Sequence, residues 1–132
     1  MSRSTPPEPR EVLIVDDEED LGFSLALSLE LAGYQVRTAF TGQDALSLVD
    51  DHEPDAIVLD LRLPDIDGWD LLGRLRTAGR FPRIPVVVVS ASVDPATTAR
   101  AADLGCRACL VKPFSAAELK RAVQAALPGT VG

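Results

Sequence analysis

A set of polar residues placed directly after short apolar runs has the composition of a phosphoryl-transfer site. The set consists of Asp16, Asp17, Asp60, Ser90 and Lys112. An aspartate carboxylate is a competent nucleophile toward phosphorus and forms an acyl phosphate. Because phosphoryl transfer depends mainly on positioning and charge neutralisation, a metal ion on one side and a lysine on the other are the expected companions. A serine hydroxyl can donate a hydrogen bond to a phosphoryl oxygen.

The three aspartates also predict a metal site. Two carboxylates ~4 Å apart repel each other by ~4 kcal/mol at an effective dielectric constant near 20, so three of them need a counter-charge. A hard divalent cation supplies it, and Mg²⁺ is satisfied by one or two carboxylates, waters and a phosphate oxygen. We therefore expect Asp16, Asp17 and Asp60 to hold Mg²⁺, with Ser90 and Lys112 facing the transferred group.

The apolar runs that precede these residues predict β-strands. Unbroken runs rich in valine and isoleucine are typical of parallel strands buried on both faces. The expected strands cover residues 12–15, 34–39, 55–60, 84–89 and 108–111, the second of them as an edge strand. The expected helices run from the acidic stretch after Val15 to about Ala32, from Thr41 to about Asp51, from near Asp67 to about Gly79, from Pro95 to Leu104, and from Ser115 to Leu127.

A strand–helix pattern repeated five times predicts the fold class α/β, a doubly wound five-stranded parallel sheet with helices on both faces. Right-handed crossovers and one reversal of winding give the flavodoxin-like strand order 2-1-3-4-5. Strands 1 and 3 are then neighbours at the switch point, where side chains beyond the carboxyl ends of the strands face a crevice. The five polar residues are expected to converge there.

Composition limits the class of protein. With 132 residues and 46% hydrophobic content, the chain predicts one domain at 11–127, with residues 1–10 as a disordered lead-in and 128–132 as a short tail. A net charge of −7 argues against direct contact with nucleic acid or an anionic membrane. No apolar run approaches the ~20 residues of a membrane span, and the start lacks an apolar signal core, so a cytoplasmic location is expected.

On these motifs the sequence resembles the receiver domain of two-component response regulators. The resemblance covers roughly residues 11–127 and depends on four segments: Val15-Asp16-Asp17-Glu18, Asp60 to Gly68, Ser90-Ala91 and Lys112-Pro113-Phe114. It implies that Asp60 accepts phosphate, that the backbone carbonyl of Arg62 joins Asp17 and Asp60 on Mg²⁺, and that Asp16 acts largely through water. It also implies a cis peptide bond between Lys112 and Pro113.

The resemblance further implies a signalling domain that catalyses only its own phosphorylation and dephosphorylation. The phosphate donor would be a sensor histidine kinase or a histidine phosphotransfer protein, and a homodimer on phosphorylation is an open alternative. A chain that ends at Gly132 would act by protein contact, whereas a longer protein would carry an output domain. Cys109 departs from the family, which usually has Tyr or Phe three residues before the lysine, so transmission of the signal is expected to differ.

Three other signals are interpreted as structural. Cys106 and Cys109 spell C-x-x-C but straddle a loop and a strand, so we expect two reduced, partly buried thiols. His52 precedes Pro54 and is expected in a surface loop. The cluster Arg74, Arg76, Arg80 and Arg83 is expected to form a solvated face. On the first helix, an apolar stripe of Leu21, Leu25, Leu29 and Ala32 is expected to pack on the sheet. A second stripe of Phe23, Leu27 and Leu31 either packs under the last helix or the lead-in, or docks a helical partner.

Two other classes of protein share parts of this pattern. A small phosphatase of the haloacid-dehalogenase type also combines Asp, Ser and Lys around Mg²⁺, but it would place the nucleophile after the first strand and leave the Asp60 loop unexplained. A flavodoxin needs a hydroxyl-rich phosphate loop after the first strand, where this chain has five consecutive acidic residues, 16–20.

Overall fold

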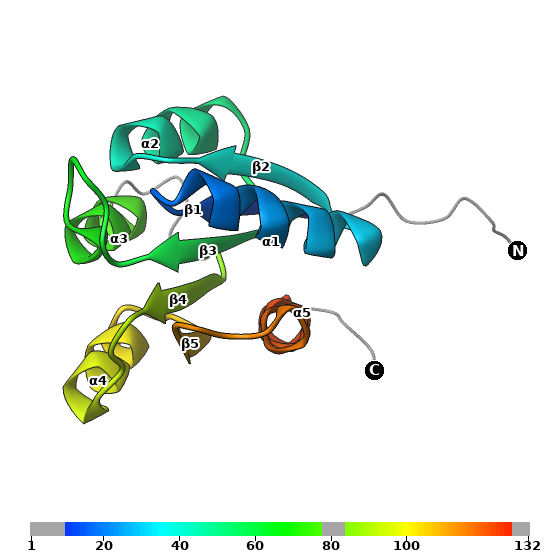
Figure 1. Cartoon of the computed structure of the whole chain (residues 1–132). Helices are drawn as coiled ribbons and strands as arrows, with labels where there is room; N and C mark the ends of the chain where they lie inside the picture. The colour runs from blue at the N-terminus through cyan, green and yellow to red at the C-terminus, as the bar shows by residue number, and fades with distance from the viewer. Residues whose placement is uncertain (1–9, 78–83, 128–132) are drawn as a thin grey trace, which may run out of the picture.

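The computed structural model describes residues 10–77 and 84–127. Its centre is a five-stranded parallel sheet in the order β2-β1-β3-β4-β5, as the sequence predicts (Figure 1). The strands are β1 (Glu11–Val15), β2 (Gln35–Ala39), β3 (Ala56–Asp60), β4 (Val86–Ser90) and β5 (Ala108–Val111). The interior strands β1, β3 and β4 are almost wholly buried, and the edge strands β2 and β5 are half-buried over most of their length.

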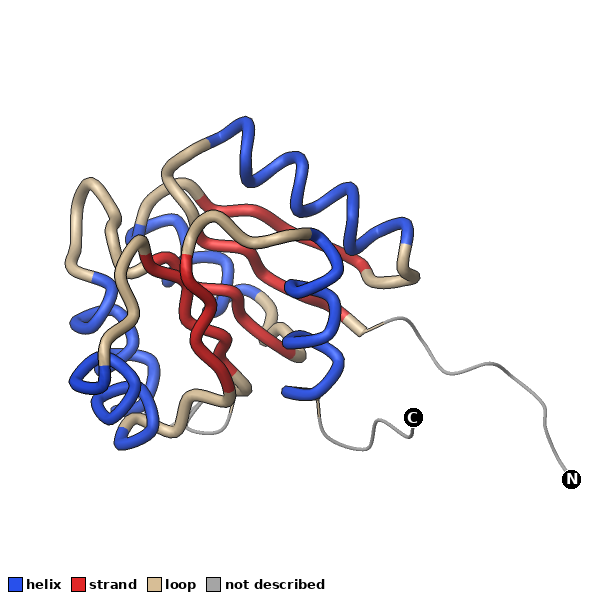
Figure 2. The backbone as a smooth tube through the Cα atoms, turned by 60° about the horizontal axis from the view of Figure 1, so that its bottom comes forward, coloured by secondary structure: helices blue, strands red, loops and turns tan. Residues whose placement is uncertain are grey.

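Helices cover both faces of the sheet (Figure 2). They are α1 (Glu19–Leu31), α2 (Gly42–Asp51), α3 (Gly68–Thr77), α4 (Pro95–Asp103) and α5 (Ala116–Ala126). The apolar side chains form two clusters, one between the sheet and α1 with α5, the other between the sheet and α2, α3 and α4. The predicted doubly wound α/β fold is therefore confirmed.

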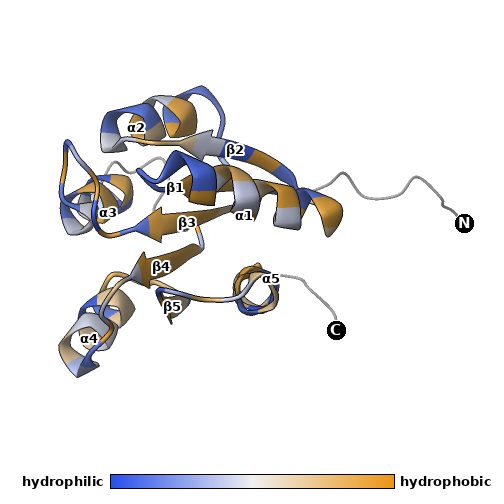
Figure 3. Ribbon diagram, in the orientation of Figure 1, coloured by the Kyte–Doolittle hydropathy of each residue, from blue (hydrophilic) through white to orange (hydrophobic). Residues whose placement is uncertain are grey.

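The side chains on the two faces of each interior strand belong to different clusters, because successive side chains of a strand point to opposite faces of the sheet. In β1, Val12 and Ile14 join the cluster under α1 and α5, whereas Leu13 and Val15 join the opposite one. All four are at most 1% exposed. Full burial of such a side chain contributes about 1.5–3 kcal/mol to stability. The other two interior strands, β3 and β4, are likewise built from hydrophobic residues (Figure 3).

The helix ends follow local signals in the sequence. Gly33 has φ = +103°, a left-handed conformation that closes α1 without the steric cost a side chain would bring. Asp94 caps α4, and Ser115 with Glu118 forms a reciprocal capping box on α5. The predicted end of α3 near Gly79 lies outside the described residues, as do the lead-in before Arg10 and the tail after Leu127.

The two stripes of α1 differ sharply in burial. Leu25 and Leu29 are buried, Leu21 is half-buried and Ala32, which we expected in the same stripe, is exposed as the C-cap. Ala32 therefore does not belong to the inward face. The second stripe is exposed over its whole length: Phe23 56%, Leu27 57% and Leu31 81%.

One residue of the predicted arginine face is not solvated. The half-buried Arg76 donates to the carbonyl oxygens of Leu104 (2.8 Å), Ile84 (2.8 Å) and Gly105 (3.5 Å), so it ties α3 to the end of α4. The solvated-face prediction is wrong for Arg76 because backbone carbonyls left open at the end of α4 accept its guanidinium. Arg74 is exposed as expected, and Arg80 and Arg83 lie outside the described residues.

Candidate functional site

The carboxyl ends of β1, β3 and β5 bring one lysine and four carboxylates together. Lys112 Nζ lies 3.1 Å from Asp16 Oδ2, 2.9 Å from Glu18 Oε1 and 3.0 Å from Asp60 Oδ2. One oxygen from each of Asp16, Asp17, Glu18 and Asp60 lies within 4.8 Å of the others. These residues are up to 96 positions apart in the chain, and the parallel sheet places them at one edge.

The two aspartates at the ends of β1 and β3 are rigidly held. Asp16 and Asp60 are 3% and 4% exposed, whereas Asp17 and Glu18 are open to solvent. Asp16 Oδ1 accepts the amide of Glu18 at 2.9 Å, and the Asp16 amide itself donates to the Ala39 carbonyl at 3.0 Å. In the same way Asp60 Oδ1 accepts the Arg62 amide at 2.9 Å. Each carboxylate thus has one oxygen fixed by the backbone and one directed toward Lys112.

The charges of the cluster perturb one another. Burial alone would lower the pKa of the Lys112 ammonium, but hydrogen bonds to Glu18, Asp60 and Asp16 outweigh it and raise this pKa above the ordinary value. Burial raises the pKa of Asp16, and the hydrogen bonds from the Glu18 amide and from Lys112 oppose that rise. At neutral pH the lysine is therefore firmly charged and serves as the counter-ion of the carboxylates.

This donor set fits a hard divalent cation. Like charges 4.8 Å apart repel by about 3–4 kcal/mol at an effective dielectric constant near 20. The single ammonium group of Lys112 leaves the four carboxylates with an excess of negative charge, and all the candidate donors are oxygens. An oxygen-only donor set with two solvent-open members matches Mg²⁺, which keeps several waters.

The loop after β3 is shaped by a close backbone approach. The Gly68 amide donates to the Leu61 carbonyl at 3.0 Å, and Arg62 pairs with Asp67 in a short antiparallel bridge. A Cβ atom on Gly68 would lie 2.5 Å from Leu61 Cα, which leaves room for glycine alone. The loop of residues 61–67 therefore follows Asp60 directly, and its end at Gly68 is held against its first residue, Leu61.

Comparison with known proteins identifies the chain. The family model of the response regulator receiver domain matches residues 12–124. The chain belongs to this family. The match includes β1 from Val12 onward, the other four strands and the four segments that carry the resemblance, and it does not support the phosphatase alternative.

Relatives and solved structures agree with this assignment. The receiver domain is 40% identical over 116 residues to the transcriptional regulatory protein KdpE of Mycobacterium tuberculosis, covering 88% of this chain and 50% of that protein. The same identity and 88% coverage apply to PrrA of the same organism, of which 49% is covered. The chain thus spans about half the length of these curated relatives. Receiver domains act in two-component signal transduction and generally interact with histidine kinases.

Among solved structures, chemotaxis protein CheY4 of Vibrio cholerae has a TM-score of 0.85 at 27% identity, covering 90% of this chain and 99% of that one. The receiver domain of a Francisella response regulator has a TM-score of 0.81 at 31% identity, covering 88% and 95%. Both share the five-stranded architecture described above.

The remaining predicted site residue of the receiver domain also lies at this edge. Ser90 is the last residue of β4, and its carbonyl accepts the Lys112 amide at 2.8 Å. Its hydroxyl oxygen accepts the Ser92 amide at 3.3 Å, which holds it within the loop after β4. The Lys112–Pro113 peptide bond is cis, as the family resemblance implied. The side chain of Arg62 is exposed.

The three residues that we set aside as structural behave as predicted. His52 is exposed after the end of α2. Cys106 and Cys109 are free and half-buried. Burial raises the pKa of the Cys106 thiol to about 11 and raises that of Cys109 as well, so neither is activated as a nucleophile. Cys109 packs against the core under α2, α3 and α4.

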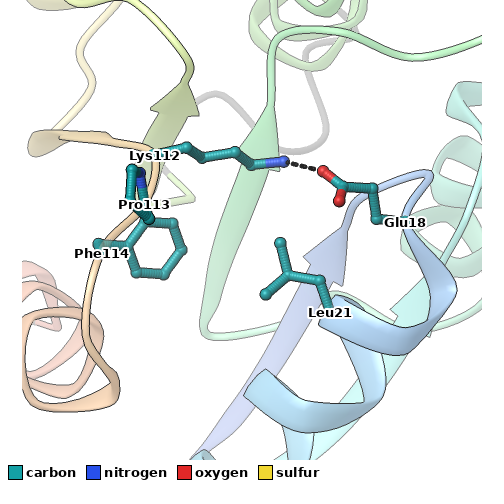
Figure 4. Close-up of a pocket in the computed structure, with 5 residues that line it drawn as sticks. All are labelled: Glu18, Leu21, Lys112, Pro113 and Phe114. Carbon is teal, nitrogen blue, oxygen red and sulfur yellow. Dashed lines mark hydrogen bonds and ion pairs between the residues drawn. The ribbon is translucent and has the colours of Figure 1, made fainter.

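Sequence reasoning missed Glu18 as a partner of Lys112. The two residues are 94 positions apart, and an acid at the start of a helix is normally explained by the helix dipole. Glu18 and Lys112 also line a pocket of about 340 Å³ with Leu21, Pro113 and Phe114 (Figure 4).

Across residues 10–77 and 84–127, each helix is too short or too polar to span a lipid bilayer.

Proposed function

We propose that Asp60 of this receiver domain accepts a phosphoryl group from the phosphohistidine of a partner protein and later releases it to water. The observation that carries the proposal is the contact of Lys112 with both buried aspartates, because it joins a nucleophile, a cationic group and a set of oxygen donors in one place. The partner would be a histidine kinase or a histidine phosphotransfer protein.

The proposed reaction is a direct displacement at phosphorus. An Asp60 carboxylate oxygen forms the new P–O bond, while the P–N bond to the partner's imidazole breaks and its electron pair returns to the ring nitrogen. The Arg62 amide keeps the carboxylate in a fixed orientation through Oδ1. Lys112, which contacts Asp60 Oδ2 before the reaction, would follow the negative charge to a phosphoryl oxygen, and the Ser90 hydroxyl would donate to another.

The residues that would hold Mg²⁺ are Asp16, Asp17 and Asp60, together with the backbone carbonyl of Arg62. When bound, Mg²⁺ would offset the negative charge shared by these carboxylates and the phosphoryl oxygens. Asp16, whose Oδ1 already accepts the Glu18 amide, would contribute mainly through a water molecule. Asp17 is exposed and is the member most free to adjust to the ion.

The exposed stripe of α1 is the proposed docking surface for the partner. Phe23, Leu27 and Leu31 recur at intervals of four residues, the spacing with which one helix packs along another. Phe23 also makes an edge-to-face contact with Phe40, which holds the ring in place at the end of α1 nearer the carboxylates. The apolar pocket of Leu21, Pro113 and Phe114 lies beside Lys112, where an apolar side chain next to the partner's histidine would fit (Figure 4).

The test is phosphorylation by acetyl phosphate with Mg²⁺, followed by mass spectrometry of the intact protein and its peptides. The wild type should carry one phosphoryl group that persists for minutes and maps to Asp60. Asp17→Asn should keep the fold and lose almost all labelling, because a donor is removed while carboxylate repulsion is relieved. A label on Asp16 with rapid turnover, or undiminished labelling of Asp17→Asn, would contradict the assignment.

A further inference from the structure

The loop that follows Asp60 is attached to a helix that takes no part in the site. Asp65, in the middle of the 61–67 loop, accepts two backbone amides from the start of α2. Its Oδ1 lies 2.8 Å from the Gly42 nitrogen and its Oδ2 lies 2.9 Å from the Gln43 nitrogen. The first amides of a helix have no partner within the helix, so this carboxylate supplies two of them from 22 and 23 residues away.

These contacts are not needed simply to give α2 an N-cap, because α2 has its own. The Thr41 hydroxyl accepts the Asp44 amide at 3.0 Å, and the Thr41 carbonyl accepts the Ala45 amide at 3.1 Å. Asp65 adds a second, external attachment to the same helix end. Asp65 is exposed and therefore a carboxylate at neutral pH, and the two donated hydrogen bonds lower its pKa further.

An apolar contact reinforces the attachment. Ile66 packs so closely on Gly42 that a Cβ atom there would lie 2.9 Å from Ile66 Cγ1. The far end of the loop is held independently, since the Gly68 amide bonds to the Leu61 carbonyl. The loop is thus fixed at its middle by α2 and at its ends by its own backbone, and Arg62 lies between these points.

We infer that Asp65 is a positioning residue, whose attachment to the start of α2 fixes the backbone at Arg62 and thereby the orientation of Asp60. The inference rests on the proposed function, in which Asp60 and the Arg62 carbonyl hold Mg²⁺. Asp65 itself touches no reacting atom. It acts through the 61–67 loop, because the Arg62 amide orients Asp60 Oδ1 at 2.9 Å and the Arg62 carbonyl belongs to the next peptide unit.

The experiment compares Asp65→Ala, Asp65→Asn and Thr41→Ala. Asp65→Ala removes both acceptors, whereas Asp65→Asn removes the same charge but keeps one oxygen acceptor. Thr41→Ala weakens the same end of α2 without touching the loop, and serves as the matched control. Hydrogen exchange of the Arg62 amide, measured without Mg²⁺, reports the loop. Mg²⁺ affinity follows from the fluorescence of Trp69, the single tryptophan, whose amide bonds to Asp67 at the end of the loop.

Asp65→Ala should speed exchange at Arg62 and weaken Mg²⁺ binding by roughly tenfold or more, the effect typical of losing a residue that orients a ligand. Asp65→Asn should fall between Asp65→Ala and the wild type, and Thr41→Ala should resemble the wild type in both measurements. If Asp65→Ala and Asp65→Asn had equal effects on Arg62 exchange and Mg²⁺ affinity, the lost charge alone would explain them, and the role given to the Asp65 hydrogen bonds would be wrong. If Thr41→Ala had the same effect as Asp65→Ala, a weakened start of α2 would explain it, and the positioning role of Asp65 would be wrong.

The two proposals fail separately. If the wild type does not bind Mg²⁺ or take up a phosphoryl group, the proposed function is wrong, while exchange at Arg62 still judges the positioning role. If the wild type binds and Asp65→Ala leaves both the Arg62 exchange and the Mg²⁺ affinity unchanged, the inference about Asp65 is wrong. Should Asp65→Ala fail to fold, Asp65→Asn carries the same comparison with a smaller expected change.

Discussion

Replacing Lys112 by alanine tests the electrostatic account of the site most directly. The Lys112 side chain is 18% exposed, and it contacts Asp16 and Asp60, whose side chains alone are 4% and 5% exposed. An ion pair 3.0 Å apart is worth about 5.5 kcal/mol at an effective dielectric constant of 20, before the cost of removing both charges from water. Breaking a buried pair by deleting one partner typically costs 3–5 kcal/mol. Because part of this cluster is open to solvent, we expect Lys112→Ala to lose about 2–3 kcal/mol of unfolding free energy without Mg²⁺.

The loss should depend on pH in a defined direction. Lys112 has a raised pKa, so its contribution is complete below the ordinary lysine value of 10.5 and fades as the pH rises through the higher value in the folded state. Asp16 also has a raised pKa, and without the ammonium group it should rise further. A carboxyl group with a raised pKa destabilises the fold above that pKa and ceases to do so once protonated. The difference between wild type and variant should therefore be largest between about pH 6 and 10 and shrink toward pH 4.

Urea unfolding at several pH values, with and without Mg²⁺, measures these differences in unfolding free energy, and thermal unfolding at pH 7 gives a second measure. At pH 7 the midpoint of thermal unfolding should fall by about 10 °C in the variant, and Mg²⁺ should restore most of the loss because it replaces the missing counter-charge. Lys120→Ala, which removes an exposed lysine of α5, is the control for net charge. A loss that is equal at pH 4 and pH 7, or one that Mg²⁺ does not reduce, would refute the reasoning.

Two further predictions concern the helices around the site. Phe23→Glu should sharply reduce phosphoryl transfer from the partner kinase while acetyl phosphate labelling stays normal, with Ser24→Glu as the control for added charge on α1; equal survival of both reactions would show that the stripe does not dock the partner. Arg100 lies over the ring of Trp69, 4.6 Å from its centroid, so Arg100→Ala should cost about 0.5–1 kcal/mol and speed amide exchange in α4. The Arg121→Ala variant of α5 should leave α4 exchange unchanged, and an α4 that exchanges equally in both would contradict a local role for the cation–π contact.

The strand ends could be predicted because parallel sheets constrain them. Buried runs such as Val86–Val89 have the composition of interior strands, and a parallel sheet must place the residue after each run at the same edge. The convergence of Asp16, Asp60 and Lys112 then follows from strand order alone. The helix starts at Asp94 and Ser115 were equally predictable, because capping uses residues within one turn of chain.

The roles of residues at helix ends could not be predicted in this way. Arg76 was assigned to a solvated face because arginine usually lies at the surface, and its carbonyl partners only become available where α3 meets the end of α4. Ala32 was placed on the inward stripe because the 3.6-residue period was extended one step too far, to the residue that caps α1. In both cases the error arises at a helix end, where backbone groups compete with the hydrophobic pattern.

The 61–67 loop shows why part of the site is invisible in the sequence. Pro64, Asp65 and Gly68 are typical turn formers, so local reasoning explains each of them without a long-range partner. Only the fold brings the start of α2 within 2.8 Å of the Asp65 carboxylate. Once that contact exists, the loop has a fixed middle, and Arg62 can hold Asp60 in one orientation. The position of Asp60, the proposed nucleophile, is thus specified by its strand, whereas the inferred control of its orientation comes from a helix that begins 18 residues earlier in the chain.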